Sequence, residues 1–283
     1  MAKIWKGTPV ADAIMKQLAQ RVQQLQVKGV KPTLSILRIG ERPDDLAYER
    51  GAISRCKKVG IAVQLVPLPA SYSQEELLSS IRRINEDGRI HGCLVLRPLP
   101  HEEDEQAVCD LLAPEKDVDC ITPGALSTVF SGKGVGYPPC TAQACIELLD
   151  YYGVSLEGRR VTVIGRSLVI GKPVSMMLQN RDATVTMCHT KTVDIPAVCW
   201  NAEILITAAG KARLVDERFV TAGQVVLDVG INVGKDGRPC GDVAFDAVAP
   251  IVDAITPVPA GVGAVTTAVL AKHVIEAAEK RLK

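Results

Sequence analysis

A strand, a glycine turn and a helix start follow one another in the segment VTVIGRSLVIGKP. The largely β-branched residues 161–164 predict a buried parallel strand, which leads into the turn Gly165, Arg166 and Ser167. A second glycine follows at Gly171. Glycine lets the backbone approach a phosphate, and the free N–H groups of a following helix attract an anion. The spacing departs from G-x-G-x-x-G, so a purely structural turn is the alternative. We interpret the segment as a dinucleotide-binding turn.

A second strand is expected at residues 183–188 and ends in His189, Thr190, Lys191 and Thr192. An NAD site usually places an acid about 20 residues after the glycine turn, where it binds the ribose hydroxyls. This segment offers hydroxyls and a cation instead, which together with the arginine of the turn favour a 2′-phosphate. The sequence therefore predicts NADP rather than NAD, although Lys191 alone would fit a solvated loop charge.

Three further loops carry groups that could bind or transform a substrate. Tyr48 is expected near the start of a helix, and Asp117 and Asp119 belong to the acidic turn KDVD. A carboxylate there could accept hydrogen bonds from two adjacent N–H donors. The loop of residues 256–263 presents proline and glycine backbone to a flat ligand. The alternatives are a surface tyrosine, a solvated acidic turn and a simple lead-in to a helix.

The elements that must position these groups alternate along the chain. In the first half we expect helices at 8–29, 46–59 and from the Ser73/Glu76 capping box, with strands at 33–39, 61–66 and 92–96. In the second half we expect strands at 160–164, 183–188, 204–208 and 225–229, an apolar segment at 251–255, and helices at 141–152 and 263–282. Residues 113–139 are rich in proline and glycine and are interpreted as the connection between domains. The alternation predicts an α/β fold with parallel sheets covered on both faces.

Composition limits the classes of partner. The chain has 283 residues, enough for two domains, and its net charge of +1 gives no electrostatic footprint for nucleic acid or an acidic membrane surface. No apolar run is long enough to span a bilayer, and the N-terminus lacks a signal-peptide core, so we expect a cytoplasmic protein. The nine cysteines show no C-x-x-C pair, so we expect buried thiols and no metal site.

Motifs along nearly the whole chain resemble the bifunctional methylenetetrahydrofolate dehydrogenase/cyclohydrolase family. The matching segments are GERPDDLAY from Gly40, GCLVLRPLP from Gly92, PEKDVD from Pro114, PCT from Pro139, VIGRSLVIGKP from Val163, ATVTMCH from Ala183, DVGIN from Asp228, GDV from Gly241 and TPVPAGVG from Thr256. The resemblance implies a folate-binding catalytic domain of residues 1–140 plus the helix 264–283, and an NADP-binding Rossmann domain of residues 141–263. It also implies a catalytic cleft between these domains.

The family oxidises 5,10-methylenetetrahydrofolate to the methenyl form by hydride transfer to NADP, then hydrolyses that cation to 10-formyltetrahydrofolate. Membership would place the chain in cytoplasmic one-carbon metabolism and purine biosynthesis, with tetrahydrofolate derivatives as ligands and a homodimer as the assembly. Hydride transfer mainly requires orientation of two rings, whereas hydrolysis also requires water and proton management. The two activities can therefore be lost separately.

The resemblance assigns roles to individual positions. On the cofactor side, Gly165, Arg166 and Ser167 match the phosphate-binding turn, Thr190 stands where a serine is usual, and Ile231 lies at the nicotinamide-side strand end. On the substrate side, Tyr48 matches the active-site tyrosine and Asp119 the pterin-binding aspartate, with Pro259 and Gly261 in the last substrate loop.

Two departures concern catalysis. The family's catalytic lysine, one helical turn after the tyrosine, is Ala52 here, and its strand glutamine is Leu96. Alanine and leucine cannot carry a proton, and the nearby Arg55 and Arg97 are poor proton shuttles because a guanidinium stays charged. Other departures on the substrate side are Asp45, Ala125, Ala142, Ala144, Ala260, Ala264 and Val265.

Three interpretations follow from these positions. The favoured one is an NADP-dependent methylenetetrahydrofolate dehydrogenase whose cyclohydrolase step is weak or absent. The second is an enzyme on the same scaffold with a changed substrate. The third is a non-catalytic folate- or NADP-binding subunit.

Overall fold

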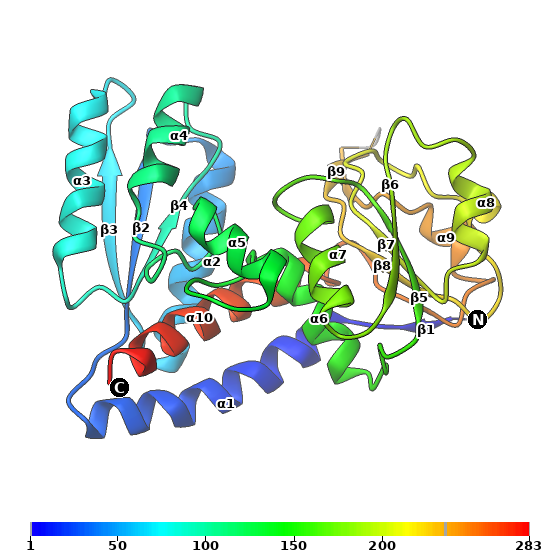
Figure 1. Cartoon of the computed structure of the whole chain (residues 1–283), viewed down its shortest axis with the longest axis horizontal. Coiled ribbons are helices and arrows are strands. Elements are labelled where there is room, and N and C mark those ends of the chain that lie inside the picture. The colour runs from blue at the N-terminus through cyan, green and yellow to red at the C-terminus, as the bar shows by residue number, and fades with distance from the viewer. Residues whose placement is uncertain (1, 235–236, 283) are drawn as a thin grey trace. The chain divides into compact units, whose positions relative to one another are not determined.

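The chain, described by a computed structural model over residues 2–234 and 237–282, divides into two compact units (Figure 1). One unit consists of Met1–Asp12 and Thr141–Thr266, and the other of Ala13–Cys140 and Thr267–Lys283. The expected domains differ at the N-terminus, because β1 (Lys3–Ile4) pairs in parallel with β11 (Ala254–Ile255). The first twelve residues therefore belong to the unit that carries the glycine turn.

The unit with the glycine turn is built on a parallel sheet of six strands. Its order is β1-β11-β8-β7-β5-β6, and the remaining strands are β5 (Arg160–Ile164), β6 (Thr184–Cys188), β7 (Ile204–Thr207) and β8 (Val225–Asp228). The strand order reverses between β5 and β7, because the chain passes from β5 out to β6 and returns to β7 on the other side. In doubly wound sheets, ligands bind at the carboxyl ends of the strands beside such a reversal.

Short helices and a small ribbon complete this unit. The helices are α6 (Cys140–Tyr151), α7 (Gly171–Gln179), α8 (Ile195–Trp200), α9 (Phe245–Val248) and the 3-10 turn η1 (Glu217–Phe219). Strands β9 (Asn232–Val233) and β10 (Pro239–Cys240) form the antiparallel ribbon. Apolar residues of β5, β7, β8 and β11 pack with those of α8, α9 and η1 in one buried cluster. The expected Rossmann-type architecture is confirmed.

The other unit has a three-stranded parallel sheet. Its order is β3-β2-β4, with β2 (Thr33–Ile39) between β3 (Ala62–Leu68) and β4 (Gly92–Val95) (Figure 1). Helices α3 (Gln74–Glu86) and α4 (Glu102–Leu111) bury Leu77, Ile81 and Val108 against residues of β2 and β4. The expected capping box opens α3, because Ser73 Oγ accepts from the Glu76 N–H and Glu76 accepts from the Ser73 N–H.

Two parts of this unit differ from expectation. Helix α2 (Pro43–Val59) begins about one turn early, because Pro43 occupies its first turn and two aspartates favour a helix N-terminus there. The region interpreted as a connection contains α5 (Pro123–Ser131), with Thr122 as N-cap and Gly132 as C-cap. The helix is too short to show a clear helical period in the sequence, although its two capping residues are typical of helix ends.

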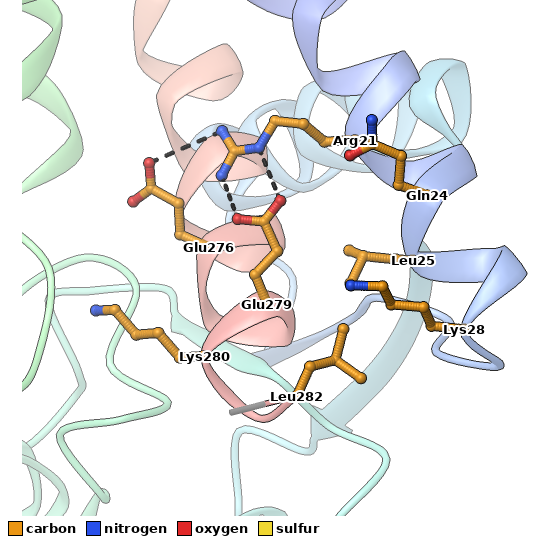
Figure 2. Close-up of a pocket in the computed structure, with 8 residues that line it drawn as sticks. All are labelled: Arg21, Gln24, Leu25, Lys28, Glu276, Glu279, Lys280 and Leu282. Carbon is orange, nitrogen blue, oxygen red and sulfur yellow. Dashed lines mark hydrogen bonds and ion pairs between the residues drawn. The ribbon is translucent and has the colours of Figure 1, made fainter.

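Helices α1 (Gly7–Val27) and α10 (Gly263–Lys280) each contain a boundary between the units. In their parts within the second unit, Arg21 of α1 donates to both oxygens of Glu279 at 2.9 and 2.6 Å, and Glu276 lies 3.9 Å away (Figure 2). The pair borders a hollow of about 450 Å³, which no residue of the expected site lines. A partly exposed pair of this kind contributes on the order of 1 kcal/mol or less.

No helix among the described residues is long and apolar enough to cross a membrane. All nine cysteines are free thiols, and all are buried except Cys109 and Cys240, which are partly buried. Burial raises the pKa of several of them, that of Cys56 to about 12, which makes these thiols unreactive.

Candidate active site

The glycine turn lies at the reversal point of the parallel sheet. Gly165 follows β5 with φ +128°, and a Cβ there would stand 2.2 Å from the Ala208 carbonyl oxygen beyond β7. A Cβ on Gly171 would stand equally close to the Gly165 oxygen. Only glycine fits either position, and the tight turn leaves the backbone accessible to a phosphate.

The helix after this turn begins without a side-chain cap. Ser167 Oγ accepts from the Ile170 N–H at 3.1 Å, which shapes the turn, whereas Ile170, the N-cap of α7, makes no capping hydrogen bond of its own. Arg166 and Ser167 are exposed. The N-terminus of α7 and an exposed guanidinium therefore suit the binding of an anion beside Gly165.

The loop expected to bind the 2′-phosphate lies beside this turn, because the Gly165 N–H donates to the Cys188 carbonyl at 2.9 Å. Thr192 Oγ1 accepts from the His189 N–H at 2.9 Å, and His189 Nδ1 accepts from the Lys191 N–H at 3.1 Å. These bonds close the loop and leave Thr190 and Lys191 exposed. Thr190 and Lys191 therefore follow the end of β6, beside the glycine turn that follows β5.

The expected nicotinamide-side and last-loop residues also come together. Ile231, Pro259 and Gly261 line one cavity of about 310 Å³. Ile231 is 75% exposed, so its apolar side chain is available to an apolar ligand surface at this cavity. The Thr256 hydroxyl accepts from the Asp228 N–H at 2.8 Å and thereby ties the last loop to β8. The cavity suits a flat ring.

Tyr48 and Asp119 lie near each other in the other unit. Burial, together with the neighbouring Asp119 carboxylate, raises the pKa of the Tyr48 phenol well above its usual value. Asp119 Oδ1 accepts from the Cys140 N–H at 3.0 Å, yet burial still raises the pKa of this carboxyl. At neutral pH Tyr48 is therefore a neutral donor rather than a base.

The two acids of the KDVD turn have separate roles. Asp117 is fully buried and accepts from the N–H groups of Ile121 and Thr122 at 3.0 and 2.7 Å, which shapes the chain before α5. Lys116 is also buried and donates to the carbonyls of Asn85 and Asp87 at 2.8 and 2.9 Å and to that of Ile84. Of the two acids, Asp119 is the one that lies with Tyr48.

The two positions where the resemblance implies a catalytic lysine and a glutamine are buried. Ala52 is fully buried in α2, one turn after Tyr48, and Leu96 is 6% exposed at the end of β4. Arg97 donates to Glu105 at 3.1 Å, so its guanidinium is held in an ion pair. Arg55 is half-buried on the same helix. A guanidinium is a hydrogen-bond donor and supplies no proton acceptor.

Sequence reasoning overlooked two buried carboxylates, Asp228 and Asp242, which are 4% and 0% exposed in the unit with the glycine turn. Both lie in segments that carry the family resemblance, DVGIN and GDV, so an acid within two residues of a glycine was an available signal. Among residues 2–234 and 237–282, no group of three or more His, Cys, Asp or Glu side chains could hold a metal ion.

The doubly wound sheet and its glycine turn define a nucleotide-binding α/β protein. Comparisons with known families identify which family of this class the chain belongs to. Residues 5–119 match the catalytic-domain model of the tetrahydrofolate dehydrogenase/cyclohydrolase family, and residues 139–282 match its NAD(P)-binding-domain model. The chain belongs to the tetrahydrofolate dehydrogenase/cyclohydrolase family.

Individual relatives agree with this assignment. The chain is 50% identical over 275 residues to the "Bifunctional protein FolD" of Clostridioides difficile (strain 630), covering 97% of this chain and 96% of the relative. The solved bifunctional enzyme FolD from Campylobacter jejuni superposes with a TM-score of 0.95 at 33% identity, covering 99% and 100% of the two chains. FolD from Trypanosoma brucei, solved with NADP cofactor and an inhibitor, gives 0.92 at 36% identity, covering 100% and 99%.

Proposed function

We propose that this chain is an NADP-dependent methylenetetrahydrofolate dehydrogenase in which the cyclohydrolase step is weak or absent. The substrate would be 5,10-methylenetetrahydrofolate and the product 5,10-methenyltetrahydrofolate. The observation that carries the proposal is Ala52, a fully buried methyl group one helical turn after Tyr48 where the family has its catalytic lysine. Resemblance to the family further supports a homodimer in cytoplasmic one-carbon metabolism.

The cofactor assignment is supported by the turn at Gly165 and by the loop beside it. The turn is tight because neither Gly165 nor Gly171 carries a Cβ, which would stand 2.2 Å from a backbone oxygen in each case. Arg166, Thr190 and Lys191 are exposed around it and offer a cationic, hydroxyl-bearing surface for a 2′-phosphate. The T. brucei relative, solved with NADP, is consistent with this choice. When bound, NADP supplies the nicotinamide ring that accepts the hydride.

Folate binding is supported by Asp119 and Tyr48. A carboxylate with one oxygen held by the Cys140 N–H keeps further lone pairs for adjacent N–H donors of a pterin ring. Tyr48 stays protonated at neutral pH because burial and the charge of Asp119 raise its pKa. These residues can bind and orient the ring, which is the main requirement for hydride transfer.

Hydrolysis of the methenyl product requires more than orientation. A group must manage protons as water adds to the methenyl carbon. Neither Ala52 nor Leu96 can donate or accept a proton, Tyr48 is a neutral phenol, and Arg97 is paired with Glu105. The expected consequence is that the methenyl product accumulates.

The test follows NADPH and methenyltetrahydrofolate separately after the protein is mixed with methylenetetrahydrofolate and NADP. We expect both to accumulate together in the wild-type protein. Disappearance of the methenyl product well faster than in buffer alone would refute the loss of the cyclohydrolase step. Substrate binding without turnover would instead favour the non-catalytic subunit, and NADP binding without folate binding would favour a changed substrate.

A gain-of-function variant sharpens the test. The double variant Ala52→Lys/Leu96→Gln restores the two family side chains, and we expect it to hydrolyse methenyltetrahydrofolate faster than the wild type. Ala52→Met/Leu96→Gln is the matched control, because methionine has a long unbranched side chain without an ammonium group. Equal hydrolysis by both double variants would show that the amine at position 52 is not what the chain lacks.

A further inference from the structure

Asp242 is a buried carboxylate that collects hydrogen bonds from two separate loops. Its oxygens accept from three consecutive backbone N–H groups, those of Ala209, Gly210 and Lys211, at 2.6, 3.1 and 2.9 Å. It also accepts from Asn232 Nδ2 at 2.9 Å. The first three donors lie beyond β7 and the fourth lies beyond β8, so one side chain ties together the ends of two neighbouring strands.

Asp228, the last residue of β8, holds the segment that carries Asp242. It accepts from the backbone N–H groups of Asp242 and Val243 at 2.9 and 3.0 Å, from that of Gly230 at 3.2 Å, and from Thr207 Oγ1 at 3.2 Å. Two carboxylates close together in a buried site repel each other, so each requires several donors. The observed donors meet that requirement for both.

Two glycines make this arrangement possible in a reciprocal way. A Cβ on Gly230, two residues after Asp228, would stand 2.2 Å from the Asp242 carboxylate. A Cβ on Gly241, directly before Asp242, would stand 1.8 Å from the Asp228 carboxylate. Each acid therefore packs against the glycine beside the other acid. Ordinary side chains at these two positions would force the carboxylates away from their donors.

The loops that Asp242 joins belong to the nucleotide site. The segment before Ala209 packs on the glycine turn, because the Ala208 oxygen lies only 2.2 Å from the position that a Cβ of Gly165 would take. The other loop carries Ile231, 75% exposed, into the 310 Å³ cavity. A shift of either loop would change the distance from the phosphate-binding turn to the ring-binding cavity.

We infer that Asp242, supported by Asp228, is a positioning residue that fixes the nicotinamide-side loop of the NADP site through Asn232 and Gly230. The inference rests on the proposed cofactor. Asp242 sets the position of Ile231 relative to the Gly165 turn, while the adenosine half of NADP is bound by other residues. Its loss should therefore weaken binding of the whole dinucleotide more than binding of an adenosine fragment.

The test measures binding by titration calorimetry without any folate. Two variants change the hydrogen bond between Asn232 and Asp242. Asp242→Asn removes the charge of the acceptor, and Asn232→Ala removes the donor and leaves the three backbone donors of Asp242 intact. Asn201→Ala, at an exposed position after α8, is the matched control. The probes are NADP and adenosine 2′,5′-bisphosphate, and each variant's Tm is recorded.

We expect the Kd for NADP to rise on the order of tenfold in Asn232→Ala, as for the loss of one hydrogen bond to a charged group, and by more in Asp242→Asn. The Kd for adenosine 2′,5′-bisphosphate should stay within twofold of wild type in Asn232→Ala, and the control should bind both probes normally. A lower Tm with an unchanged Kd for NADP in Asn232→Ala would overturn the inference, since that pattern marks a purely structural bond.

Equal weakening of both probes in Asn232→Ala would likewise overturn it, because the effect would then extend beyond the nicotinamide side. Failure of the wild-type protein to bind NADP would refute it together with the cofactor assignment. If wild type binds NADP but forms no methenyl product, the proposed reaction fails, and the dissociation constants still decide the role of Asp242.

Discussion

Gly165 owes its identity to the space around it as well as to its backbone angle. Its φ of +128° is rare for other residues, and the Ala208 oxygen occupies the place of a Cβ. Gly158 makes a useful contrast, because it also has a positive φ, +73°, but nothing lies within 4 Å of its Cβ position. The comparison separates backbone strain from steric exclusion at a ligand-binding turn.

Gly165→Ala is expected to weaken NADP binding at least tenfold, because the turn must move away from Ala208 to admit the methyl group. Gly158→Ala should cost about 1 kcal/mol of stability through strain alone and leave NADP affinity unchanged. Calorimetric titration with NADP and thermal unfolding check both expectations. Equal effects of the two substitutions on affinity would contradict a steric role for Gly165.

Asp119→Asn is expected to lower kcat/KM for methylenetetrahydrofolate by about 10- to 100-fold, the usual cost of losing hydrogen bonds to a charged acceptor. The amide would present an NH2 group with two N–H donors where the carboxylate offers only acceptors. Steady-state kinetics at saturating NADP measures the change. Asp110→Asn on the surface of α4 is the control. A variant with wild-type kcat/KM would remove Asp119 from the substrate site.

At the scale of elements, a buried cation provides hydrogen-bond donors to the C-terminal carbonyls of helix α3. Its N-terminus is closed by the Ser73/Glu76 capping box, whereas Lys116 reaches its C-terminal end from a distant loop. A helix leaves its last carbonyls without intrahelical donors and carries partial negative charge there. Lys116 satisfies both requirements, and its burial lowers the pKa of its amine to about 8.

Lys116→Met should therefore destabilise the unit that contains α3 by about 2 to 4 kcal/mol, because buried carbonyls lose their charged donor. Methionine retains an unbranched apolar stem, which isolates the effect of the ammonium group. Lys16→Met, at an exposed position of α1, should change stability by less than about 0.5 kcal/mol. Circular dichroism during urea unfolding measures both changes, and similar values for the two would contradict this role.

At the scale of the whole molecule, pH should act differently on the two units. Burial and the nearby charge of Asp242 raise the pKa of Asp228 to about 6, despite the opposing backbone donors. A folded state that binds this proton more tightly is stabilised fully below the unfolded pKa of about 4. That contribution is lost as the pH rises through about 6.

The unit with Asp228 should therefore lose on the order of 3 kcal/mol of stability from this group between about pH 4 and about pH 6. Both tryptophans, Trp5 and Trp200, belong to that unit, so their fluorescence during urea unfolding reports on it. The variant Asp228→Asn should be less stable overall and lack this fall. An unchanged pH dependence in the variant would contradict the shifted pKa. His91 lies in the other unit, and burial lowers its pKa to about 4. Its contribution to stability is therefore lost as the pH falls, which is the opposite of the effect of Asp228.

The sequence by itself predicted most strands of the two sheets and the glycine turn at Gly165. Strands 33–39 and 160–164, the capping box at Ser73 and the turn at Gly165 all follow from local pattern, because propensity, capping and glycine content act over a few residues. The order of motifs also identified the family, which the family models confirm.

Only the tertiary structure decided the contacts between distant segments. In the structure β1 pairs with β11, and Lys116 donates to carbonyls at the C-terminal end of α3. Asp228 packs against Gly241, and Asp242 packs against Gly230. The physical reason is that these contacts depend on which strand ends and loops meet in space. A buried carboxylate or lysine has the same identity in the sequence whether it binds a ligand or holds a loop, and its hydrogen-bond donors and acceptors distinguish the two.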